Sequence, residues 1–178
     1  MCSLEPLKID LKGADEGLTK REFDLDNAFF EAIDAQEVRQ GRVHVALNIQ
    51  RSGSVFNLVF RSTGTVTVPC DLCLDEMEQP VEAETSLTAK LGTEYSEEDD
   101  VITVDENEGI LDVAWLIYES IALAIPIKHV HAPGKCNAAM TQRLEELSAA
   151  RSSDGDEETA VDPRWSALKN LKIEQFKD

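Results

Sequence analysis

A strict alternation of apolar and polar side chains, beginning at Val43, constrains the fold of this chain more than any other feature of its sequence. Successive side chains of a β-strand point to opposite faces, so the alternation predicts a strand with one buried face. That face carries four aliphatic residues, Val43, Val45, Leu47 and Ile49. The turn signal at Arg51–Ser54 leads into a returning strand at Val55–Phe60. Ser62–Gly64 then predicts a second turn before Thr65–Val68, which makes a three-stranded antiparallel meander.

Other segments predict further strands and helices around this meander. Strands are expected at Leu7–Leu11, Val81–Leu91 and Val101–Val104. Helices are expected at Asn27–Glu37, with Asp26 as the N-cap, and at Asn137–Ala150. Because the strands come mostly before the helices, the order favours an α+β fold. We expect an antiparallel sheet of about five to six strands packed against a few helices, with a helical C-terminal region.

The strongest helix signal lies at Val113–Ala124, and Pro126 ends it because proline cannot continue a helix. Glu119 is the only charged residue of this segment, so the helix should pack against the sheet. Seven residues are predicted to lie in the core: Val43, Val45, Leu47, Ile49, Leu116, Ile117 and Ile121.

The end of the chain differs in composition from the rest. After Arg151, the segment to Thr159 contains only Ser, Asp, Gly, Glu and Thr, which is typical of a flexible linker. Beyond it, a short helical pattern of apolar residues follows in Trp165, Leu168 and Leu171. The predicted organisation is one α+β domain at residues 1–150, an acidic linker at 151–160, and a short helix in 161–178 that docks back on the domain.

The charge of the chain narrows its possible partners. Lys and Arg number 17 against 35 Asp and Glu, which gives a net charge of −18. This excess opposes binding of nucleic acid by the surface as a whole and docking on an anionic membrane. The N-terminus lacks the apolar core of a signal peptide, and charges interrupt the apolar stretch Ile110–Ile127. We therefore expect a soluble, cytoplasmic protein.

One region of this acidic chain carries only basic charges. Between Arg39 and Cys70 there is no acidic residue, but there are four arginines, Arg39, Arg42, Arg51 and Arg61. These side chains are candidate RNA contacts, because arginine binds phosphate oxygens bidentately. The alternative is that they pair with Glu82 and Glu84 on a neighbouring strand.

The cysteines offer a candidate metal site. Cys70 and Cys73 form a CxxC pair directly after a predicted strand, and two thiolates at this spacing can bind one metal ion. The irregular segment after the main helix supplies His129, His131 and Cys136. A tetrahedral Cys₃His zinc site is therefore possible, with Cys70, Cys73, Cys136 and His131 as its candidate ligands.

Two other interpretations of the CxxC pair stay open. A thioredoxin-type redox pair requires CxxC at the start of a helix, whereas here Pro80 and a strand follow. The cysteines can also be simple packing or turn elements. No common catalytic motif occurs in the chain, which favours a binding protein without a small-molecule substrate over an enzyme such as a thiol oxidoreductase.

The order of these motifs resembles the YceD family, the large ribosomal RNA subunit accumulation proteins of bacteria and plastids. The resemblance rests on Pro69–Leu74, on the helix region Ile110–Pro126, and on the terminal motif that begins Asp162, Pro163, Arg164. It extends from about Leu7 to Leu171. Many members carry a second cysteine cluster after the helix, whereas this chain has Cys136 alone, with histidines as the possible substitutes.

The resemblance implies a non-catalytic ribosome-biogenesis factor that supports accumulation or processing of large-subunit (23S) ribosomal RNA. Its partner would be a ribosomal RNA precursor or a ribosomal protein, with direct RNA binding as one route. The alternative is an acidic adaptor or assembly chaperone for a ribosomal protein, one that does not touch RNA.

Overall fold

A long antiparallel hairpin organises the fold. Strands β3 (Gln40–Ser52) and β4 (Val55–Pro69) pair along almost their whole lengths, from Gln40 opposite Thr67 to Ser52 opposite Val55. The four aliphatic residues predicted to face the core from β3 are all buried. The two-residue alternation therefore gave the correct buried face.

The computed structural model describes residues 4–35, 37–93, 96–98 and 101–147. The hairpin belongs to a six-stranded sheet of order β2-β3-β4-β5-β7-β6. Its other strands are β2 (Gly17–Leu25), β5 (Glu76–Gly92), β6 (Ser96–Glu98) and β7 (Val101–Asp105). Neighbours are antiparallel except β5 and β7, which run parallel. After a 3₁₀ turn η1 at Glu5–Leu7, strand β1 (Lys8–Asp10) pairs with β8 (Ile110–Asp112) in a second, two-stranded sheet.

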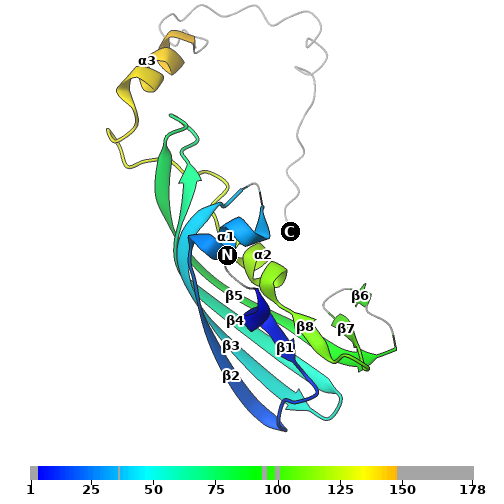
Figure 1. Cartoon of the computed structure of the whole chain (residues 1–178). Coiled ribbons are helices and arrows are strands. Elements are labelled where there is room, and N and C mark those ends of the chain that lie inside the picture. Colours follow the sequence, from blue (N-terminus) through cyan, green and yellow to red (C-terminus); the bar gives the residue numbers. More distant parts are fainter. Residues whose placement is uncertain (1–3, 36, 94–95, 99–100, 148–178) are drawn as a thin grey trace, which may run out of the picture. The chain divides into compact units, whose positions relative to one another are not determined.

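Two helices pack on one face of the large sheet (Figure 1). Helix α1 (Asn27–Ile33) contacts β2 and β3, and its predicted N-cap, Asp26, accepts a hydrogen bond from the Ala28 backbone N–H. Helix α2 (Ala114–Leu123) contacts β4 and β5. The α+β fold class is therefore confirmed.

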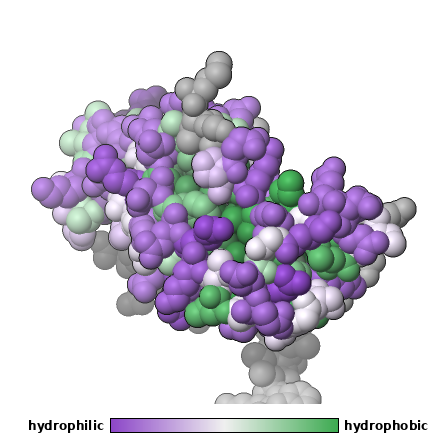
Figure 2. Space-filling model, turned by 60° about the horizontal axis from the view of Figure 1, so that its bottom comes forward, coloured by the Kyte–Doolittle hydropathy of each residue, from purple (hydrophilic) through white to green (hydrophobic). Residues whose placement is uncertain are grey.

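The core lies between the sheet and α2. Ile117 and Ile121 are fully buried, and Leu116 is partly buried against the same cluster. The largest buried side chains are aromatic: Phe29, Phe30, Phe56 and Phe60. Figure 2 shows one face of the molecule, on which hydrophobic side chains gather between hydrophilic ones. The apolar interior therefore reaches the surface on this face.

The predicted turn at Ser62–Gly64 is wrong, because β4 runs through it without a break. Ser62 is buried, and Gly64 lies opposite Val43 in the ladder. A Cβ atom at Gly64 would lie 2.2 Å from the Arg42 carbonyl oxygen. The glycine permits two backbones to approach closely, which is the usual meaning of glycine inside a strand.

Other element predictions need smaller corrections. The predicted helix Asn27–Glu37 ends at Ile33, because Asp34 adopts the left-handed conformation with φ of 54°. Strand β2 was not predicted, because Arg21 occupies one of its inward positions and interrupts the apolar alternation. Arg21 is nevertheless exposed, since β2 is an edge strand, and a charged residue at an inward position is typical of such strands. Strand β5 begins at Glu76, well before the predicted start.

The chain divides into two compact units, Met1–Arg143 and Leu144–Asp178. The boundary between the two units falls within helix α3 (Ala138–Leu147). The predicted linker at 151–160 and the predicted helix in 161–178 lie outside the described residues.

Candidate metal centre

The CxxC segment forms a tight turn at the end of β4. The Leu74 N–H donates to the Cys70 carbonyl at 2.9 Å, and the Cys70 N–H donates to the Asp75 carbonyl at 2.9 Å. Leu74 has a φ of 62°, so the chain reverses through a left-handed residue before it enters β5. This turn buries both Cys70 and Cys73.

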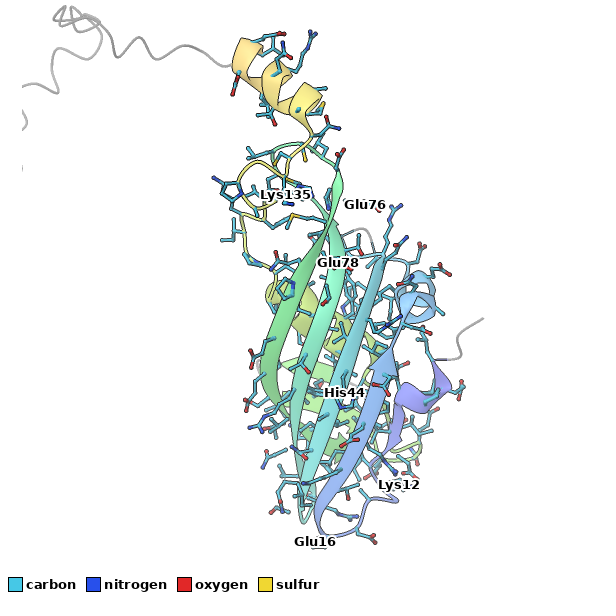
Figure 3. The ribbon with its side chains drawn as sticks, turned by 90° about the vertical axis from the view of Figure 1, so that its left-hand side faces the viewer. Lys12, Glu16, His44, Glu76, Glu78 and Lys135 are labelled. Carbon is cyan, nitrogen blue, oxygen red and sulfur yellow. The ribbon has the colours of Figure 1, made fainter. Side chains whose placement is uncertain are left out.

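The segment after α2 folds against this turn through hydrogen bonds to Asp71 and Asp75. The Asp71 N–H donates to the His129 carbonyl at 3.0 Å, and the Asp71 carboxylate accepts from the His129 N–H at 2.7 Å. Farther along, the Asn137 side-chain amide donates to the Asp75 carboxylate at 3.2 Å. Lys135 of this segment and Glu76 both lie toward one end of the sheet, whereas Glu16 lies toward the other (Figure 3).

These contacts bring the four predicted ligands together. The ligand atoms of Cys70, Cys73, His131 and Cys136 all lie within 4.8 Å of one another. The Cys70 and Cys136 sulfurs are 3.8 Å apart, and His131 Nδ1 lies 3.4 Å from the Cys73 sulfur and 4.0 Å from the Cys136 sulfur. Around a tetrahedral zinc ion, S–S and S–N separations are about 3.8 Å and about 3.6 Å. The cluster therefore fits the donor set and the spacing of a Cys₃His site.

The sulfur separations also bear on the other interpretations of the cysteines. A disulfide needs sulfurs about 2.05 Å apart, so the thiols of Cys70, Cys73 and Cys136 are free. The CxxC pair is followed by a strand rather than by a helix. The geometry is therefore less suited to a thioredoxin-type pair than to metal binding.

The electrostatics of the cluster favour a thiolate at Cys70 before one at Cys136. Burial opposes ionisation of Cys70, but hydrogen bonds from the Cys73, His131 and Leu72 backbone N–H groups lower its pKa to about 6. Burial raises the pKa of Cys136 to about 11, and the neighbouring sulfurs of Cys70 and Cys73 add to this effect. A divalent cation reverses such repulsion, because it stabilises every thiolate that binds it.

His129, the other histidine of the segment, has different partners. Its Nδ1 lies 3.1 Å from the Pro126 carbonyl oxygen, and its Nε2 lies 3.6 Å from the Asp71 carboxylate. Sequence reasoning did not single out Asp71 and Asp75, which orient this segment. Their position inside and just after the CxxC pair was the available signal.

The four candidate arginines do not form one cluster. Arg39 and Arg42 are exposed at the start of β3, whereas Arg51 lies nine residues after Arg42, which corresponds to about 30 Å along an extended strand. Arg61 is exposed in the middle of β4 and pairs with Glu84 at 3.2 Å, as the alternative interpretation expected.

Arg51 is engaged inside the fold. Its guanidinium donates to the Ala14 carbonyl oxygen, lies 3.6 Å from the Glu16 carboxylate, and stacks over the Phe56 ring at 5.4 Å. These contacts hold the loop before β2 against the β3–β4 turn. Arg51 therefore has a structural role in this hairpin.

The sequence of this chain matches the model of a known protein family. The model of the family described as large ribosomal RNA subunit accumulation protein YceD matches residues 58–172, more than half of the chain. The chain belongs to the YceD family. The YceD match begins within β4 and includes the whole Cys₃His cluster. No curated protein and no solved structure matches the chain.

The terminal motif Asp162, Pro163 and Arg164 lies within the family match but outside the described residues. Within the described part of the chain, no helix has the length and apolar character needed to cross a membrane.

Proposed function

We propose that this chain supports the accumulation of large-subunit ribosomal RNA in the cytoplasm as a non-catalytic binding protein. The observation that carries the proposal is the family match over residues 58–172. The metal cluster supports the non-catalytic part, because four protein ligands are typical of structural zinc, whereas catalytic zinc keeps a position for water or substrate.

The cluster itself is proposed to hold one structural zinc ion. Cys70, Cys73, Cys136 and His131 would bind it, and the metal would join the segment after α2 to the end of β4. The backbone N–H groups that point at the Cys70 sulfur support a thiolate there before metal arrives. Zinc binding would therefore fix the surface formed by these two segments.

Direct RNA binding is the first route by which the chain could act. Of the four candidate arginines, Arg39 and Arg42 suit phosphate contacts best, because both are exposed and neither forms an ion pair with another described residue. Arg39 and Arg42 flank the start of β3, where Gln40 lies opposite Thr67, close to the last residue of β4. They therefore belong to the end of the sheet that carries the metal cluster.

The variant Arg39→Gln/Arg42→Gln tests this route. It should fold normally, since exposed substitutions change stability by about 0.5 kcal/mol or less. Each lost phosphate contact reduces the slope of the logarithm of the RNA-binding constant against the logarithm of salt concentration by about one. The double variant should therefore lower this slope by about two. The measurement is binding to large-subunit ribosomal RNA across a salt series. Lys20→Gln/Lys90→Gln, with the same charge change elsewhere on the sheet, is the matched control. Equal salt slopes for both variants would exclude the Arg39 and Arg42 contact.

The second route is an acidic adaptor that binds a ribosomal protein and not RNA. The net charge of −18 favours a basic protein partner. Arg51 is held by contacts within the fold and Arg61 is paired with Glu84 at the surface, which makes both less available to RNA than Arg39 and Arg42. Normal complementation by the Arg39→Gln/Arg42→Gln variant would favour this route over direct RNA binding.

A further inference from the structure

An apolar groove runs beside the exposed side of α2. It has a volume of about 500 Å³ and is lined by Asp34, Ala35, Glu37, Trp115, Tyr118, Glu119, Ala122 and Leu123. Trp115 is 56% exposed and Leu123 is 80% exposed, although both belong to a helix whose opposite side is buried in the core. Large apolar side chains this exposed at the edge of a groove are typical of an interaction site.

The groove continues into a second hollow of about 340 Å³. Glu37 and Ala122 line both, so the two hollows adjoin. The second is lined mainly by apolar residues: Val68, Pro69, Ile125, Pro126 and Ile127. Ile127 is completely exposed. Exposed apolar side chains from Trp115 on α2 to Ile127 beyond it therefore line the two adjoining hollows.

The charged residues of this groove all have one sign. Asp34, Glu37 and Glu119 line it, and its two parts include no lysine or arginine; His129, in the second hollow, is the one basic side chain among their lining residues. The C-terminal end of α2 adds partial negative charge, because the last carbonyl groups of a helix lack partners within the helix. An apolar floor with an acidic rim is complementary to a segment that carries an apolar stripe flanked by basic residues.

We infer that this groove binds a basic amphipathic helix of a partner protein. Helix-in-groove recognition places apolar side chains at i, i+3, i+4 and i+7 in the groove, and lysine or arginine on either side would meet the acidic rim. The inference rests on the adaptor form of the proposed function and names its docking site. Peptide binding is measured apart from ribosomal RNA, so failure of the groove and failure of the proposed function give different results.

Trp115 provides the readout for the test. The chain has two tryptophans, Trp115 and Trp165, so Trp165→Phe leaves Trp115 as the only one. The probe is a synthetic helix of about 15 residues with leucine at the four stripe positions and lysine elsewhere. Its scrambled version, of identical composition and charge, controls for general attraction to an acidic protein. We expect the helix to shift the Trp115 emission to the blue and to bind about tenfold or more tightly than the scrambled peptide.

Two leucine variants locate the binding. Leu123→Glu should weaken binding of the amphipathic peptide by about tenfold or more, because it places a charge on the apolar floor. Leu18→Glu, at a residue of β2 that is 56% exposed, should leave binding unchanged. Equal binding of the two peptides, or equal affinities of the two variants, would overturn the inference.

Another occupant of the groove would also overturn it. A blue-shifted Trp115 emission without peptide would show that the groove is already filled. If that shift depended on protein concentration, the occupant would be a second copy of the chain; if it did not, the occupant would be the chain itself.

Discussion

Replacing Cys73 with serine is expected to abolish stoichiometric zinc binding and to lower the free energy of unfolding by about 4 kcal/mol. This figure is the stabilisation expected when zinc binds only the folded state and is present at about a thousand times its dissociation constant. The unmodified chain, purified without chelator, should contain one zinc ion per molecule. The strands should remain, because the buried aromatic core lies outside the cluster.

Elemental analysis and denaturant unfolding, with circular dichroism for the strand content, measure these effects. Cys2→Ser is the matched control, since Cys2 is the one cysteine outside the candidate site. A chain that purifies without zinc would contradict the structural zinc site, as would identical zinc content and stability for the two serine variants.

Replacing Gly64 with alanine is expected to destabilise the hairpin by about 3 kcal/mol, at the upper end of the usual cost of overpacking. The new Cβ would lie 2.2 Å from the Arg42 carbonyl oxygen and 2.7 Å from the Val43 Cα atom. Both neighbours belong to the backbone, so no side-chain rotation can relieve the contact. The strands would have to separate where β3 and β4 support the core.

Gly53 provides the contrast for this prediction. It lies in the β3–β4 turn with a φ of 63°, and a Cβ atom there would meet nothing within 4 Å. Gly53→Ala should therefore cost only about 1 kcal/mol, from the left-handed backbone alone. Chemical denaturation of both variants measures the difference. A Gly64→Ala variant as stable as Gly53→Ala would show that the close approach of the two backbones is not required.

Gly64 also illustrates what the sequence could not resolve. Glycine indicates either a turn or a close backbone contact, and only the partner strand distinguishes the two. The buried face of β3 was predictable, since side-chain alternation is a local property of a strand. The parallel pairing of β5 with β7 was not, because it depends on contacts between separate segments.

In the candidate site too, the residue types could be predicted from the sequence, whereas their arrangement could not. Ligand chemistry was enough to name Cys70, Cys73, Cys136 and His131, but their proximity depends on a fold that joins segments far apart in the chain. The arginines show the opposite case. Their own region has no acidic residue, yet Glu16 and Glu84 reach two of them from neighbouring segments.

The proposed role in ribosomal RNA accumulation is measured by the ratio of large-subunit to small-subunit ribosomal RNA in cells that lack this chain. We expect the ratio to fall in such cells, to recover when the unmodified chain is supplied, and to recover less when the Cys73→Ser variant is supplied at the same protein level. An unchanged ratio in cells that lack the chain would contradict the proposed role in ribosomal RNA accumulation.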